Sequence, residues 1–111
     1  MTPYIIDGQE YTINRVDVIA ASSALTTVVA GATGYKHRVI AFELQADSST
    51  CSITWQSNAT AIANVMSIAS TSITASPSVP FWFETASGEA LKINNATALR
   101  TAYGQVWFVT Y

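Results

Sequence analysis

The residues that could carry out acid–base or nucleophilic chemistry are few and scattered along the sequence. The 111-residue chain has a single histidine, His37, and a single cysteine, Cys51, beside seven carboxylates. A Ser-His-Asp arrangement would have to combine His37 with Asp17 or Asp47, and the glycine-flanked serine of a nucleophile elbow is absent from the sequence. We therefore expect no catalytic residues and no enzymatic activity, with His37 solvated at the start of a strand.

Metal, cofactor and phosphate sites have equally little support in the sequence. One histidine and one cysteine cannot supply the ligands that a zinc ion requires, although three copies of the chain could share an ion at an axis through His37. Gly31 and Gly34 lack the lysine and the following helix of a phosphate-binding loop. Cys51 stands within an alternation of apolar and polar residues and is predicted to be a small buried hydrophobe. We expect no metal and no cofactor.

The charge content argues against nucleic acid and membrane partners. Five basic residues face seven acidic ones, and they are scattered except for Lys36, His37 and Arg38, which we expect to form a solvated strand end. Binding to phosphates requires a denser basic surface. The charge-free stretches at residues 18–35 and 48–83 are rich in Ser and Thr, whereas a membrane-spanning helix needs about 20 mainly apolar residues. No basic and apolar leader opens the sequence, so we expect synthesis and folding in a cytoplasm.

Hydrophobic periodicity predicts β structure along the whole chain. Asp7 and Gly8 separate two short apolar runs, and Asp-Gly supplies the positive φ angles of a two-residue hairpin turn. Strand-like runs then recur at spacings of about 8–12 residues, which is typical of an all-β sandwich or barrel. We expect an antiparallel β-sandwich of about eight strands. Residues 1–15 would form an N-terminal arm or hairpin, and residues 16–111 the sandwich domain.

Two consecutive strands are predicted most clearly, and they are expected to pair with each other. In residues 38–46, one face carries Ile40, Phe42, Leu44 and Ala46. In residues 51–56, one face carries Cys51, Ile53 and Trp55. Near the C-terminus we expect a strand over residues 99–103, a turn at Gly104 and a last strand over residues 106–111.

The last strand is apolar on both faces. One side carries Val106 and Phe108, and the other carries Trp107, Val109 and Tyr111. A sandwich strand normally buries one face and exposes the other to water. The second face therefore needs a cover, either another subunit or the loops and N-terminal arm of the same chain, and we expect a symmetric homo-oligomer. The apolar run at residues 81–83 needs a cover of the same kind. The subunit-interface candidates are therefore Trp82, Trp107, Val109 and Tyr111.

The tryptophans allow a second interpretation. Trp55, Trp82 and Trp107 could form a platform on which sugar rings stack, as in carbohydrate-binding modules. Each of them stands in an apolar strand, so packing in the core or at an interface is the favoured interpretation.

Two stretches resemble a domain that recurs in structural proteins of tailed bacteriophages. The first comprises residues 35–46, YKHRVIAFELQA, followed by SITWQS at residues 52–57. The second comprises residues 80–95, PFWFETASGEALKINN. The residues that match in the second stretch are Trp82, Glu84, Thr85, Gly88, Glu89, Ala90 and Leu91. The resemblance spans residues 34–111, but between Gln56 and Pro80 no family pattern is recognised.

The resemblance implies a jelly-roll-like sandwich that acts as a capsid decoration, or cement, protein, or as a module of a head or tail fibre. We expect a homotrimer on the outer capsid surface of the virion, with the major capsid protein of the phage as its partner. In such decoration proteins an N-terminal arm commonly reaches across to neighbouring capsid subunits. The capsid-contact candidates are therefore Tyr4, Ile5, Ile6, Tyr11 and Ile13. A fibre or tail module that binds host-surface carbohydrate is the alternative.

Overall fold

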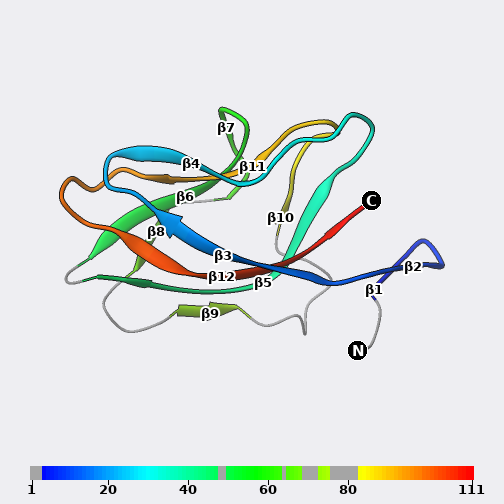
Figure 1. The fold of residues 1–111 in the computed structure, drawn as a ribbon, viewed down its shortest axis with the longest axis horizontal. Helices are drawn as coiled ribbons and strands as arrows, with labels where there is room; N and C mark the ends of the chain where they lie inside the picture. Colours follow the sequence, from blue (N-terminus) through cyan, green and yellow to red (C-terminus); the bar gives the residue numbers. More distant parts are fainter. Residues whose placement is uncertain (1–3, 48–49, 64, 69–72, 76–82) are drawn as a thin grey trace.

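The chain folds into antiparallel sheets that pack against each other, which confirms the predicted all-β sandwich (Figure 1). The computed structural model describes residues 4–47, 50–63, 65–68, 73–75 and 83–111. Regular structure in these residues consists of strands, and they include no helix that could span a membrane.

The first sheet joins strands from both ends of the chain. Its order is β10, β5, β12, β3, and β9 also pairs with β5. These strands are β3 (Asn14–Ala20), β5 (His37–Ala46), β9 (Ile73–Ala75), β10 (Phe83–Glu84) and β12 (Ala102–Thr110). Strand β12 therefore lies in the interior of the sheet, between β5 and β3, and β3 lies at its edge.

The second sheet covers one face of the first. Its order is β4, β11, β6, β7, and β8 also pairs with β6. These strands are β4 (Ala24–Val29), β6 (Cys51–Ser57), β7 (Thr60–Ala61), β8 (Met66–Ile68) and β11 (Leu91–Asn95). A separate two-stranded sheet contains β1 (Tyr4–Ile6) and β2 (Gln9–Tyr11).

The pairing follows a nested order. Strand β3 pairs with β12, β4 pairs with β11, and β5 pairs with β10, so an antiparallel ribbon of chain is wrapped into two facing sheets. This is the arrangement of a jelly roll. Short edge strands of only two residues, such as β7 and β10, raise the number of strands above the eight that were expected.

The predicted pairing of the two clearest strands is wrong. Strand β5 belongs to the first sheet and β6 to the second, so the chain crosses the sandwich between them. Their apolar faces meet across the core, where the rings of Phe42 and Trp55 lie 5.6 Å apart. Alternation in a sequence identifies the buried face of a strand, but it does not say whether the next strand is a neighbour or lies opposite.

The core is built around Trp55, which is fully buried. Its ring lies 5.4 Å from that of Phe83 and packs within the same cluster as Phe42. Cys51 is also buried, as predicted, and burial raises the pKa of its thiol. Such aromatic contacts add to the free energy gained by removing large apolar surfaces from water.

A β-bulge corrects the predicted face of β5. Trp107 pairs with Ala41 and Phe108 pairs with Val39, which leaves Ile40 as an extra residue in the ladder. A bulge of this kind shifts the alternation of side chains by one position. Val39 therefore joins the core cluster in place of Ile40, while Ile40 is buried outside that cluster.

Gly104 lies inside a strand and not in the turn that was predicted. Strand β12 continues through Gly104, which pairs with Val18 on one side and Leu44 on the other. A Cβ atom at this position would lie 1.9 Å from the carbonyl oxygen of Glu43. The glycine is required because β5 approaches β12 closely here, and close backbone approach is a common reason for glycine within a strand.

We predict that Gly104→Ala lowers the free energy of unfolding by about 3 kcal/mol, because the added methyl group overlaps Glu43 and must force the two strands apart. The matched control is Gly8→Ala, where no atom lies within 4 Å of the added Cβ. The control is expected to cost only about 1–2 kcal/mol, the penalty of a left-handed backbone. Urea unfolding followed by tryptophan fluorescence measures both, and equal losses would contradict the steric argument.

Candidate functional site

The N-terminal hairpin extends beyond one end of the sandwich, near the C-terminus (Figure 1). Strands β1 and β2 are joined by Asp7 and Gly8, whose φ angles of 50° and 80° confirm the predicted two-residue turn. Ile5 pairs with Glu10 and is 60 % exposed, whereas the next residue, Ile6, is buried. The hairpin therefore has one apolar side chain turned to the protein and one turned to solvent.

A group of five side chains attaches this hairpin to the sandwich. We call Tyr4, Tyr11, Arg38, Glu84 and Tyr111 the hairpin anchor. The ring of Tyr11 meets the ring of Tyr111 edge to face, with centroids 5.8 Å apart, and the side chain of Tyr4 hydrogen-bonds Arg38. Tyr4 thus contacts a residue of β5 in the first sheet, and Tyr11 contacts the residue that follows β12.

Arg38 forms the centre of the hairpin anchor. One of its nitrogens, Nη2, donates to the hydroxyl of Tyr111 at 2.8 Å and to Oε1 of Glu84 at 3.3 Å. Its guanidinium carbon lies 4.8 Å from the centroid of the Tyr111 ring, within cation–π range. The hydroxyl of Tyr111 in turn donates to Oε2 of Glu84. Three residues that are distant in sequence therefore form a closed set of charge-assisted contacts.

The burial of Arg38 and Glu84 means that the contacts of the hairpin anchor must replace hydrogen bonds to water. The side chains of Arg38 and Glu84 are mostly buried, and an ion pair removed from water is stable only when its remaining donors and acceptors find partners. Burial lowers the pKa of Arg38, but the hydrogen bond that Arg38 donates to the side chain of Tyr4 and the charge of Glu84 outweigh it, so the pKa lies above its ordinary value. Burial and the hydrogen bond to Glu84 raise the pKa of Tyr111, which keeps its hydroxyl protonated as a donor.

The structure accounts for part of the apolar outer face of β12 within one chain. Val109 is fully buried without a second subunit, and Tyr11 covers one edge of Tyr111. The argument for a subunit interface at Val109 therefore fails, because the chain itself excludes water from this side chain. Trp107 is half-buried and keeps some exposed surface. Trp82 lies outside the described residues.

The arm residues expected to contact a capsid do not share one environment. Tyr4 and Tyr11 belong to the hairpin anchor, Ile6 is buried, and Ile13 is half-buried just before β3. Ile5 is the most exposed of the five candidates. The arm is thus a hairpin attached to its own sandwich, and Ile5 is the apolar side chain that it presents to solvent.

His37 is buried and not solvated as expected. Its Nε2 lies 2.8 Å from the carbonyl oxygen of Ala30 and its Nδ1 lies 2.8 Å from the hydroxyl of Thr110. A carbonyl oxygen only accepts, so Nε2 carries the proton and Nδ1 accepts from Thr110 when the ring is neutral. The backbone nitrogen of His37 also donates to the hydroxyl of Thr85. The histidine thereby connects the segment after β4 to both β12 and the segment after β10.

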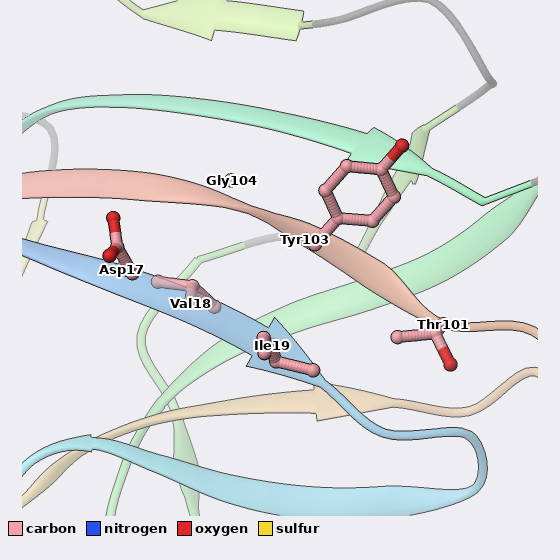
Figure 2. A pocket seen from close by; sticks show the side chains of 6 residues that line it. All are labelled: Asp17, Val18, Ile19, Thr101, Tyr103 and Gly104. Carbon is pink, nitrogen blue, oxygen red and sulfur yellow. The ribbon is translucent and has the colours of Figure 1, made fainter.

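A second surface was missed in the sequence. An open, shallow hollow of about 480 Å³ lies on β3 and β12, and Figure 2 shows its lining residues. They are Asp17, Val18, Ile19, Thr101, Tyr103 and Gly104. Ile19 is 68 % exposed and pairs directly with Tyr103, which is 39 % exposed. The signal that could have found it is Ile19 itself, an isoleucine on the same strand face as Arg15 and Asp17.

Comparison with known proteins adds no relative: no protein-family model matches the chain, and no curated protein matches it.

We predict that the hairpin anchor makes stability depend on alkaline pH. The pKa of Tyr111 is raised in the folded protein, so its contribution is complete below the ordinary tyrosine pKa of 10.0 and is lost as pH rises through the folded-state value. The free energy of unfolding should therefore fall more steeply between about pH 9 and about pH 11 in the wild type than in Tyr111→Phe.

Urea unfolding at a series of pH values measures this difference. Tyr35→Phe, which changes an exposed tyrosine outside the hairpin anchor, is the matched control and should behave as the wild type does. Parallel pH profiles for the wild type and Tyr111→Phe would contradict the prediction.

Proposed function

We propose that the chain is a structural protein of a tailed-phage virion, a decoration protein that binds the outer capsid as a homotrimer and stabilises the head. The observation that carries the proposal is the hairpin, which projects from a jelly roll, is fixed by a mostly buried ion pair, and exposes Ile5. A projecting element of this kind suits contact with a large neighbouring surface.

The residues that carry the phage resemblance also support the proposal. Arg38 comes from the first matching stretch and Glu84 from the second, and they pair in the hairpin anchor. The same two stretches meet again where the hydroxyl of Ser57 donates to Glu89 at 2.6 Å. The recognised residues therefore contribute to the attachment of the arm and to the closure of the sandwich.

The mechanism is non-covalent. A hairpin that is already ordered loses little conformational entropy when it binds, which improves affinity for a given contact area. Only 11 % of the residues are charged, so broad faces can pack against a capsid without removing many ions from water. Three linked copies gain avidity, so each individual contact can be weak.

The contact with the major capsid protein is expected at the exposed side of β1. Ile5 offers apolar area, and among the described residues no third strand pairs with the hairpin, so an extended capsid segment can add to it as a further strand. Capsid subunits bridged in this way would resist the internal pressure of packaged DNA.

The carbohydrate-binding alternative has weaker support. A sugar-stacking platform needs exposed aromatic faces, and Trp55 is fully buried in the core. Trp82 lies outside the described residues, which leaves Trp107, half-buried, as the tryptophan with exposed surface in the described part of the chain.

We predict that Ile5→Lys weakens binding to decoration-free heads of the phage by about tenfold or more, because each copy in a trimer loses its apolar contact. The anchor residues remain, so the fold is expected to be unchanged. Co-sedimentation with purified heads measures the binding. This point change is sharper than deletion of the hairpin, which would also uncover Tyr111.

The matched control is Leu25→Lys, which introduces the same charge at an exposed leucine of β4. The control should bind as the wild type does. Wild-type binding by Ile5→Lys, with its circular dichroism spectrum intact, would contradict the role of the hairpin in capsid contact.

A further inference from the structure

Strand β3 is an open sheet edge. In the described part of the chain its one partner in the sheet is β12, so the opposite side of its backbone has no strand beside it. An open edge is a template for pairing with a further strand unless the sequence prevents it.

The outward-facing residues along this edge form a symmetric pattern. Arg15, Asp17 and Ile19 pair with the outer-face residues of β12 and lie on one face, and Ile13 continues the same alternation just before β3. The order along the face is apolar, basic, acidic, apolar, and its midpoint is Val16. Arg15 and Asp17 form an ion pair within the chain at 2.6 Å, but their side chains are 49 % and 78 % exposed, so both can exchange this partner for the matching charge of a second copy.

Such a pattern is complementary to itself when two copies run antiparallel. With Val16 opposite Val16, Arg15 of each copy faces Asp17 of the other, and opposite charges across a strand pair are favourable. Moving the midpoint to Arg15 or to Asp17 would place like charges opposite each other. The charge pattern therefore selects one register among its neighbours.

The same register covers exposed apolar surface. Ile19 is 68 % exposed at the border of the hollow that it shares with Tyr103, and in this register it lies opposite Ile13 of the second copy. Both ends of the shared strand pair would then be apolar, and the centre would hold two reciprocal ion pairs.

We propose that β3 pairs antiparallel with β3 of a second copy of this chain, centred on Val16, to form a two-fold symmetric dimer. The contact is isologous, so each residue is used twice. A single strand pair buries less area than a standard interface, so the dimer is expected to dissociate on dilution, with a dissociation constant on the order of 10–100 μM.

This inference goes beyond the proposed function and does not depend on it. A two-fold contact through β3 would join trimers in pairs, whereas the proposed capsid contact uses Ile5 of the hairpin that precedes β3. Variants that abolish the β3 contact leave Ile5 in place, so the two proposals fail separately.

Charge reversal tests the contact. Arg15→Asp alone gives two acidic residues per strand, and Asp17→Arg alone gives two basic ones. Each single variant should therefore raise the dissociation constant of the dimer by about tenfold or more. The double variant Arg15→Asp/Asp17→Arg restores opposite charges across the pair and should associate as the wild type does. An equimolar mixture of the two single variants should form heterodimers.

Sedimentation equilibrium over a wide concentration range measures each of these states. Lys92→Asp on β11 is the matched control, because it makes the same change in charge on the other sheet, and it should not alter association. Circular dichroism checks that every variant is folded.

Three results would overturn the proposal. The first is a wild-type protein that stays monomeric to about 1 mM, which would mean that the charges protect the edge from pairing. The second is self-association that neither single charge reversal weakens, for example a trimer that forms no dimer or hexamer. The third is a mixture of the two single variants that gains no association.

Discussion

The C-terminal part of strand β12 must be kept from water on both of its faces, and the attachment of the hairpin to the sandwich follows from that requirement. Strand β12 lies between β3 and β5, so its backbone is paired on both sides. Val106 and Phe108 face the second sheet, and Val109 is fully buried on the opposite side. The outer face of β12 is open to water at Tyr103, whereas near the C-terminus the chain supplies a second cover over Val109.

The hairpin anchor contributes to that cover and also fixes the geometry of the arm. Arg38 and Glu84 lose much of their hydration, and the hydroxyl of Tyr111 and the side chain of Tyr4 supply hydrogen bonds that water would otherwise provide. Specific partners of this kind favour one position of the hairpin over others that apolar packing alone would allow. The exposed side of the hairpin then presents Ile5 in a defined orientation, which is the basis of the proposed capsid contact.

Local features of the fold could be predicted from the sequence. The Asp7-Gly8 turn and the burial of Cys51 and Trp55 depend on neighbouring residues and on strand alternation, and the structure confirms them. The all-β class follows from the same periodicity. Features that depend on distant partners could not be predicted in this way.

The failures share that physical cause. The carbonyl of Glu43 is what requires a glycine at position 104, and nothing beside Gly104 in the sequence indicates it. His37 is buried because Ala30 and Thr110 satisfy its ring nitrogens. The hairpin anchor likewise joins residues that are 46 and 73 positions apart, so its chemistry becomes visible only when the sheets are assembled.

The account depends most directly on the contact between Tyr11 and Tyr111 within a single chain. Ring centroids 5.8 Å apart should give strong nuclear Overhauser effects between the two side chains. In a sample that mixes isotope-labelled and unlabelled protein, filtered spectra separate contacts within a chain from contacts between chains. We predict that the effects arise within one chain and persist on dilution. Their absence, or their presence only between labelled and unlabelled chains, would contradict an arm that is anchored to its own sandwich.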